Sequence, residues 1–321
     1  LGPGRYVCAR HLRASAQPPG GLAQPELEEG ALLPHAYAFV AYYGTRAYAH
    51  PSDLRRGAPV EAFGEGFAMI VLAERLVDGV ALVQTRRGLW VEAESLRRAQ
   101  PSAFEGRSLG PGEGLDFAWV RAEGVPIRER IGGRLIRRST RRELLHLEGQ
   151  RGRFATLRGG GVIARSSLAG PTQSDPPSQV GPAERWIDVD LEAQVLTLYA
   201  GRRPLFATLV STGRPAHSTP RGEFRIWAKL ATSDMDDLGR DDVERNYAIE
   251  AVPWVQYFER GYGLHAAFWH DDFGRTRSHG CVNLSPRDAR YLFSRTRPGL
   301  PDGWEAILSI EEDRPTLVRV R

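Results

Sequence analysis

Short runs of β-forming residues, each closed by a turn signal, fill most of this 321-residue chain and restrict it to a mainly β fold. Residues 69–77 and 80–85 flank Asp78-Gly79, which is a strong signal for a two-residue hairpin turn. Residues 186–190 alternate apolar and polar side chains, and residues 195–199 are rich in β-formers. We therefore predict antiparallel strands joined by short turns.

One segment instead carries a helical pattern, with signals for both of its ends. Ser285 is a good N-cap, Pro286 suits the first helical position, and Asp288 completes a start that resembles a capping box. Apolar residues at helical spacing follow, and Pro298-Gly299 ends the pattern. We predict one short helix there.

A weak internal repeat divides the first half of the chain. Residues 88–96 parallel residues 160–168, and residues 39–44 parallel residues 119–124. Each copy has about the size of a small five-stranded barrel, and both resemble bacterial SH3-like domains. Such modules either bind cell-wall material or pack as spacers against a catalytic domain, and both interpretations stay open.

A segment rich in Pro, Ser and Gln follows the repeat and reads as a linker. The acidic stretch 233–245 is unlike a strand and suits either a mobile flap or a solvated loop. The predicted order is an N-terminal extension (1–34), a first SH3-like module (35–106), a second such module (115–170), the linker (171–183) and a C-terminal domain (184–321).

The amino-acid composition of the chain limits the kinds of partner that we expect it to bind. Hydrophobic residues make up 41% of the chain and charged residues 26%, which fits an ordinary soluble protein. No run of about 18 apolar residues is present, so no membrane span is predicted. The basic stretch 137–142 suits an anionic polymer or, as we favour, a solvated strand edge or turn. Basic and stacking aromatic residues do not interleave, so no nucleic-acid partner is predicted.

The string Ser278-His279-Gly280-Cys281-Val282-Asn283-Leu284 carries the strongest chemical signal. A thiol at its ordinary pKa is mostly protonated at neutral pH, so a nucleophilic Cys281 needs an imidazole nearby to take its proton. The flexible Gly280 lets backbone N–H groups turn toward a developing oxyanion. The alternative is a buried, inert cysteine in a turn.

This string resembles the signature of the L,D-transpeptidase (YkuD-type) catalytic domain, in which a histidine and a spacer precede Ser/Thr-His-Gly-Cys, an apolar residue and Asn or Arg. His265 follows Gly-Tyr-Gly-Leu where that family has its histidine, and 12 residues separate it from Ser278. The resemblance extends over roughly residues 184–321. His270 lies in the spacer as a second histidine, and Ala266 stands where the family usually has Gly or Ser.

The resemblance implies a β-sandwich-like domain with a short helix, and a role for each matching residue. Cys281 would be the nucleophile, His265 the general base, and the backbone around His279 and Gly280 the oxyanion hole. The residues expected to hold the substrate are Tyr257, Ser278, Asn283 and Trp269.

The implied reaction is acyl transfer on peptidoglycan stem peptides. The cysteine would form a thioester at a meso-diaminopimelate carbonyl and pass the acyl group to an amine of a second stem. Relatives in this family also use a lipoprotein lysine or water as acceptor, the latter as carboxypeptidases or amidases. No cofactor is expected, carbapenems should acylate the cysteine, and the chain should act in the periplasm or cell envelope after removal of an export signal.

Two rival interpretations stay open. A zinc site from His265, His270, His279 and Cys281 would use accepted donors, although their spacing matches no familiar zinc pattern. A non-catalytic wall-binding protein would keep the modules and lose the chemistry. A disulfide from Cys8 to Cys281 would silence the nucleophile, so we predict that none forms.

Overall fold

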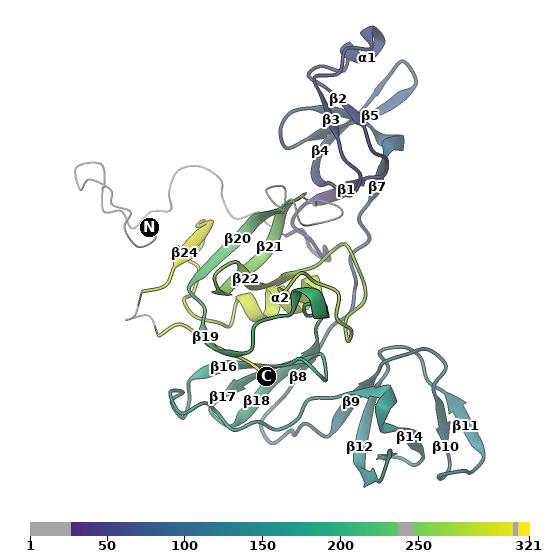
Figure 1. Cartoon of the computed structure of the whole chain (residues 1–321), viewed down its shortest axis with the longest axis vertical. Helices are drawn as coiled ribbons and strands as arrows, with labels where there is room; N and C mark the ends of the chain where they lie inside the picture. Colours follow the sequence, from purple (N-terminus) through teal and green to yellow (C-terminus); the bar gives the residue numbers. More distant parts are fainter. Residues whose placement is uncertain (1–26, 237–247, 311–313) are drawn as a thin grey trace.

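The computed structural model describes residues 27–236, 248–310 and 314–321, and within them the chain folds into three β-sheets (Figure 1). The only α-helices of these residues are the single turn α1 (Asp53–Arg56) and the two-turn α2 (Pro286–Phe293). The mainly β prediction is therefore confirmed. Cys8, and with it the predicted lack of a disulfide to Cys281, lies outside the described residues. None of the described helices is long and apolar enough to cross a membrane.

The largest sheet has twelve strands and joins the two ends of the chain. Its path runs β23-β22-β21-β4-β5-β6-β2-β3, and β1, β7, β20 and β24 pair beside this path. The N-terminal strands are β1 (Ala36–Val40), β2 (Thr45–Tyr48), β3 (Glu61–Phe63), β4 (Ala68–Val77), β5 (Val80–Thr85), β6 (Trp90–Glu92) and β7 (Leu96–Arg98). The C-terminal strands are β20 (Ala228–Asp236), β21 (Ala248–Glu259), β22 (Tyr262–Ala266), β23 (Val282–Leu284) and β24 (Ala306–Leu308).

A second sheet of seven strands is confined to residues 117–169. It holds its own buried cluster, which includes Val120, Ile127 and Ile163. Its strands are β9 (Phe117–Val120), β10 (Pro126–Arg128), β11 (Leu135–Arg138), β12 (Leu144–Arg151), β13 (Phe154–Leu157), β14 (Val162–Ala164) and β15 (Leu168–Ala169). We call strands β1–β7 the first module and β9–β15 the second module; their SH3-like character stays a prediction.

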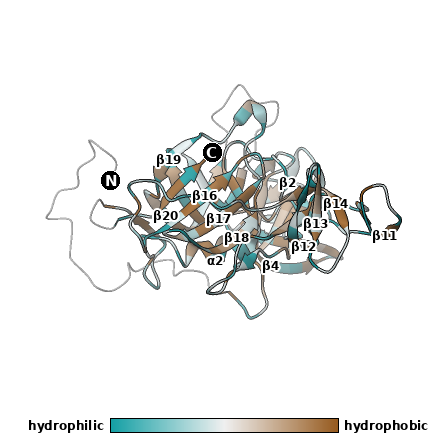
Figure 2. Cartoon of the chain, turned by 90° about the horizontal axis from the view of Figure 1, so that it is seen from below, coloured by the Kyte–Doolittle hydropathy of each residue, from teal (hydrophilic) through white to brown (hydrophobic). Residues whose placement is uncertain are grey.

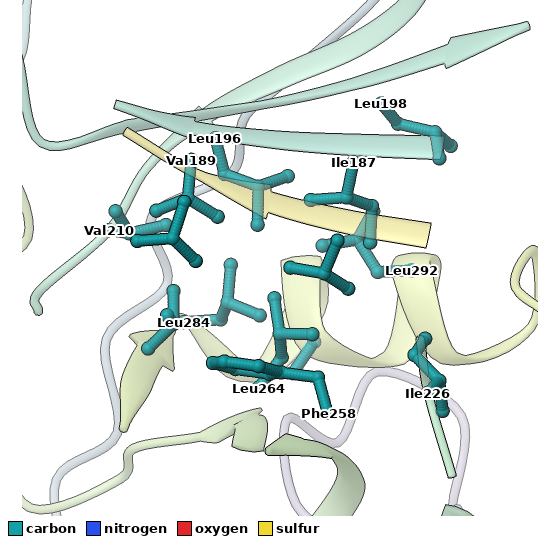
Figure 3. Close-up of a cluster of buried hydrophobic side chains, with 14 of the residues drawn as sticks. Ile187, Val189, Leu196, Leu198, Val210, Ile226, Phe258, Leu264, Leu284 and Leu292 are labelled. Carbon is teal, nitrogen blue, oxygen red and sulfur yellow. The ribbon is translucent and has the colours of Figure 1, made fainter. Parts of the chain in front are cut away.

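The third sheet has six strands, five of them from the C-terminal part of the chain. Its strands are β8 (Arg107–Ser108), β16 (Arg185–Asp190), β17 (Val195–Ala200), β18 (Arg203–Leu209), β19 (Gly222–Arg225) and β25 (Leu317–Val320). The largest hydrophobic cluster lies between this sheet, α2 and strands β22–β23 (Figure 3). Figure 2 shows hydrophobic residues in strands such as β16 and β17.

The local signals correspond to the structure closely. Val77 pairs with Val80 across the hairpin, and Asp78 and Gly79 both have the positive φ that a type I′ turn requires. Ser285 caps α2, because its Oγ accepts a hydrogen bond from the Asp288 N–H at 3.3 Å.

Of the predicted acidic loop or flap 233–245, residues 237–245 lie outside the described residues, and residues 233–236 instead form the end of β20. There the Asp234 carboxylate accepts from the Ala251 N–H at 2.8 Å and from Arg86 at 2.5 Å. Antiparallel pairing with β21 and an arginine partner thus outweigh the low β propensity of Asp. The predicted linker has no strand or helix, yet it is held on the third sheet, because Ser174 Oγ donates to Asp188 Oδ2 at 3.0 Å.

The only lysine of the chain, Lys229, is fully buried in β20. Its Nζ donates to Phe293 O at 2.5 Å and to Thr296 O at 3.1 Å, where α2 ends. These carbonyls have no partner within the helix, so Lys229 caps the C-terminal end of α2. Burial lowers the pKa of Lys229 to about 7.

We predict that Lys229→Met lowers the free energy of unfolding by roughly 2–4 kcal/mol at pH 7, since two buried acceptors lose their donor. Between pH 7 and about 10 the unfolded chain binds the lysine proton and the native chain does not, so this proton makes native stability rise with pH. Urea unfolding at pH 7 and 9.5 tests both statements. The exposed Arg203→Met is the control, and an unchanged midpoint for Lys229→Met would contradict the prediction.

Candidate active site

The parallel pair β22–β23 places the predicted reactive residues. His265 lies beside Asn283 in the register, and Leu264 and Ala266 lie beside Val282 and Leu284. Because side chains alternate along a strand, the four apolar residues enter the core and His265 and Asn283 face the opposite side. Cys281 directly precedes β23, two residues before Asn283, so it shares their face.

The turn before Cys281 depends on glycine. Gly280 has a φ of +118°, and a Cβ there would lie 2.3 Å from the Tyr262 ring. Ser278, which is buried, closes the turn: its Oγ accepts from the Gly280 N–H at 3.0 Å and donates to Cys281 O at 2.5 Å. Ser278 therefore holds the turn, and the Gly280 N–H predicted for the oxyanion hole already has a partner.

Cys281 is a free, partly buried cysteine. Its Sγ lies 3.8 Å from Gly261 O, a long contact in which the thiol donates. Burial raises the pKa of the thiol, and a backbone hydrogen bond opposes this shift only in part. The thiol is therefore the favoured resting form at neutral pH.

His265 is 2% exposed, and its Nδ1 lies 3.0 Å from Ala266 O. A carbonyl oxygen only accepts, so Nδ1 carries the proton and Nε2 keeps its lone pair. Burial lowers the pKa of His265 to about 4, and the bond to Ala266 offsets this only in part. The imidazole is neutral at rest and ready to accept a proton at Nε2.

His270, the second histidine, lies behind this face and is 7% exposed. Its Nδ1 accepts from the Asp272 N–H at 3.1 Å, so a neutral ring carries its proton on Nε2. Burial is the main cause that lowers the pKa of His270 to about 4. The Asn283 side-chain amide lies 3.0 Å from His270 Nε2. Because Nε2–H donates, we assign the amide oxygen, which accepts, to the position that faces it. That orientation also gives the buried Oδ1 of Asn283 a partner.

Both ring nitrogens of His270 are thus used, which leaves none for a metal. Among the described residues, no group of three or more His, Cys, Asp or Glu side chains could hold a metal ion. The structure therefore offers no support for the zinc alternative built on His265, His270, His279 and Cys281.

A cleft of about 620 Å³ opens over this face. Six predicted site residues line it: Cys281, His265, His279, Ser278, Asn283 and Trp269. The Trp269 ring packs 5.7 Å from His265, and exposed His279 lies 5.0 Å from His217. A larger hollow of about 770 Å³ beside Arg225 and Trp227 has no cysteine or histidine in its lining.

Tyr257 is not among the residues that line the cleft. Its hydroxyl lies 3.2 Å from Ser233 Oγ, and its ring stacks on Trp227. Burial raises the pKa of Tyr257, and the hydrogen bond with Ser233 opposes this shift in part.

Sequence reasoning missed several residues of the cleft. From the catalytic part of the chain they include Arg214, Tyr262 and Arg277. From the first module they are Phe39, Glu65 and Gly66. Tyr262 belongs to the Gly-Tyr-Gly-Leu motif that precedes His265. The first-module residues carry no local signal, because only the packing of that module brings them to the cleft.

The second module holds the loop that joins His270 to Ser278. Arg142 makes a two-point ion pair with Asp271, and Arg141 donates to Asp271 O. Burial favours a higher pKa for Asp271, but hydrogen bonds from Arg142 and Ser102 outweigh it and lower the pKa. Two residues of the basic stretch 137–142 are thus part of an internal contact. The predicted solvated edge or turn describes the exposed strand residues Arg137 and Arg138, whereas Arg141 and Arg142 lie in a turn that is partly buried by this contact.

Comparisons with known proteins find similarity over the C-terminal part of the chain. The L,D-transpeptidase catalytic domain model, YkuD, matches residues 184–302. L,D-transpeptidase 1 of Mycobacterium tuberculosis is 29% identical over 119 residues, which cover 35% of this chain and 46% of that protein. The chain thus spans about half the length of the curated relatives it matches.

Solved structures of similar proteins carry the same name. The catalytic domain of the E. faecium L,D-transpeptidase is 26% identical with a TM-score of 0.34, covering 43% of this chain and 98% of that one. The L,D-transpeptidase LdtMt1 in complex with imipenem is 16% identical with a TM-score of 0.36, covering 78% and 98%. Residues 184–302 of this chain are thus similar to the YkuD family of L,D-transpeptidase catalytic domains.

Proposed function

We propose that this protein is a cysteine-dependent L,D-transpeptidase that acts on peptidoglycan stem peptides. One observation carries the proposal: His265 lies in β22, Cys281 directly precedes the adjacent parallel strand β23, and both residues line the same cleft. The match of residues 184–302 to the L,D-transpeptidase catalytic domain model supports this reaction class. As such an enzyme it would work in the periplasm or cell envelope.

The mechanism follows from a thiol and an imidazole that are both neutral at rest. Cys281 Sγ attacks the donor carbonyl while its proton passes to His265 Nε2. When the tetrahedral intermediate collapses, the C–N bond breaks, and the imidazolium returns the proton to the leaving amine. A thioester remains on Cys281. The bond from Nδ1–H to Ala266 O keeps Nε2 available throughout.

The oxyanion is proposed to form beside the backbone of residues 279–281. One lost oxyanion donor typically costs about 3 kcal/mol of barrier. Since the Gly280 N–H donates to Ser278 Oγ at rest, its use requires that it be shared or released. The roles of the His279 and Gly280 backbone therefore stay predictions.

The second step decides between transfer and hydrolysis. An amine acceptor, deprotonated by His265, would attack the thioester and yield a cross-link between two stems. A lipoprotein lysine would react in the same way, and water would yield a carboxypeptidase or amidase. Product analysis with stem tetrapeptide, with and without an amine acceptor, separates these outcomes.

We predict that meropenem adds covalently to the native protein and that Cys281→Ala abolishes the adduct. His265→Ala should slow acylation by about 10²–10⁴-fold, the usual contribution of a general base. His270→Ala should slow it by less than about tenfold, because His270 does not line the cleft. Intact-protein mass spectrometry over time gives all three rates. A native protein that forms no adduct would favour the non-catalytic wall-binding alternative, and the reverse order for the two histidines would reassign the base.

We predict that alkylation of Cys281 by iodoacetamide rises with pH through a midpoint above about 8.5, the value for an ordinary cysteine. Burial raises the thiol pKa, so the folded chain holds less thiolate at neutral pH than the unfolded chain. A Cys8→Ser background removes the other cysteine, and the same chain in guanidinium is the control. A rate plateau between pH 5 and 7 would instead indicate a thiolate–imidazolium pair.

We predict that Arg142→Gln slows meropenem acylation by about tenfold, because the loop that carries His270 loses its ion pair with Asp271. Asp271→Asn should act similarly, and the double variant should show a coupling of at least about 0.5 kcal/mol. The control is Arg137→Gln, which breaks an exposed pair with Glu143 in the same module. Equal effects of Arg142→Gln and Arg137→Gln on the acylation rate would contradict this role.

A further inference from the structure

The first module contributes directly to the wall of the catalytic cleft. Phe39 lies in β1, and Glu65 and Gly66 lie in the turn between β3 and β4. These residues line the same cavity as Cys281 and His265, although about 200 positions of sequence separate them.

The contact between the first module and the catalytic part is extensive. The Tyr37 ring stacks on Phe268 at 4.1 Å, and its hydroxyl donates to Ala251 O at 2.7 Å. The Ile70 N–H donates to Glu250 Oε2 at 3.0 Å. A shared buried cluster joins residues of β1 and β4 to residues of β21 and to Phe268.

Backbone pairing fixes how the first module is placed against the catalytic part of the chain. Ile249 of β21 pairs in parallel with Ala68 of β4, only two residues after Gly66. The Gly66 N–H also donates to Val40 O at 3.0 Å, which holds the turn against β1. The turn therefore stands at a fixed position over the cleft, because backbone on both of its sides is anchored.

The charges that line the cleft come from different elements. Arg214 and Arg277 belong to the catalytic part, Asp236 ends β20, and Glu65 is exposed on the turn of the first module. His265 adds no charge, since its pKa is lowered to about 4. Glu65 is thus the acidic side chain that the first module presents to a bound substrate.

We propose that the 64–66 turn is part of the substrate site and that Glu65 selects for substrates with a side-chain amine. This inference rests on the proposed function and names a residue that would determine its specificity. An aliphatic amine has a pKa near 10.4 and arrives as an ammonium ion. A carboxylate on the wall binds that ion by a charge-assisted hydrogen bond and draws it toward the thioester on Cys281. The amine loses its proton to His265 only at the step of attack.

The test measures binding apart from catalysis. In a Cys281→Ala background, calorimetry compares three forms of a stem tetrapeptide that contains meso-diaminopimelate. The side-chain amine is free, dimethylated to keep its charge, or acetylated to remove it. Each form is titrated against the parent, Glu65→Gln and the matched control Glu94→Gln. Glu94 is exposed in the same module, in the 3₁₀ turn Ala93–Ser95, and does not line the cleft.

We expect acetylation to weaken binding to the parent about tenfold and dimethylation to have a much smaller effect. Glu65→Gln should remove this discrimination, Glu94→Gln should keep it, and Glu65→Arg should weaken binding of the free amine further. Thermal melting of each variant verifies folding. Equal discrimination in all variants, or no binding by the parent at 10 mM peptide, roughly the weak limit for such contacts, would overturn the proposal.

A second readout separates this inference from the proposed function. Faropenem, a β-lactam without an amine, should form a covalent adduct with the native protein. An adduct together with no discrimination between the peptides would overturn the role of Glu65 and leave the transpeptidase proposal in place. If the peptides are discriminated through Glu65 but no adduct forms, the amine site is retained and the transpeptidase proposal is overturned.

Discussion

The parallel pairing of β22 with β23 is the constraint on which the site depends. It brings together two short strands whose apolar residues enter one core, and it leaves their polar residues on the other face. Since the register also sets which residues are neighbours, a slip by one position would send His265 into the core and Leu264 into the cleft. The same strand register thus determines both the packing of the core and the positions of the reactive side chains.

Burial then decides the protonation states of the reacting groups. A largely dry surrounding raises the pKa of Cys281 and lowers that of His265, so both start neutral. In the proposed mechanism, charge develops only when the thiol attacks, and the backbone dipoles around residues 279–281 would then stabilise it. The bonds of Ser278, His270 and Asn283 keep the turn and the spacer loop in position for that step.

The two N-terminal modules are structural parts of the catalytic unit. The first shares a sheet with it and lines its cleft, and the second holds the spacer loop through Asp271. Among the described residues, both modules therefore contact the C-terminal part of the chain. Whether they also bind cell-wall material stays a prediction.

Local sequence determined the elements whose signals are local: the Asp78-Gly79 hairpin, the Ser285 cap of α2, and the motif that contains Cys281. In each case the turn or cap is made by residues within a few positions of one another. The tertiary structure alone decided that Arg142 holds Asp271, that Glu65 and Phe39 line the cleft, and that Tyr257 lies beside it. These contacts join residues that are far apart in the chain or on opposite faces of a sheet, and neither spacing nor periodicity in one sequence records them.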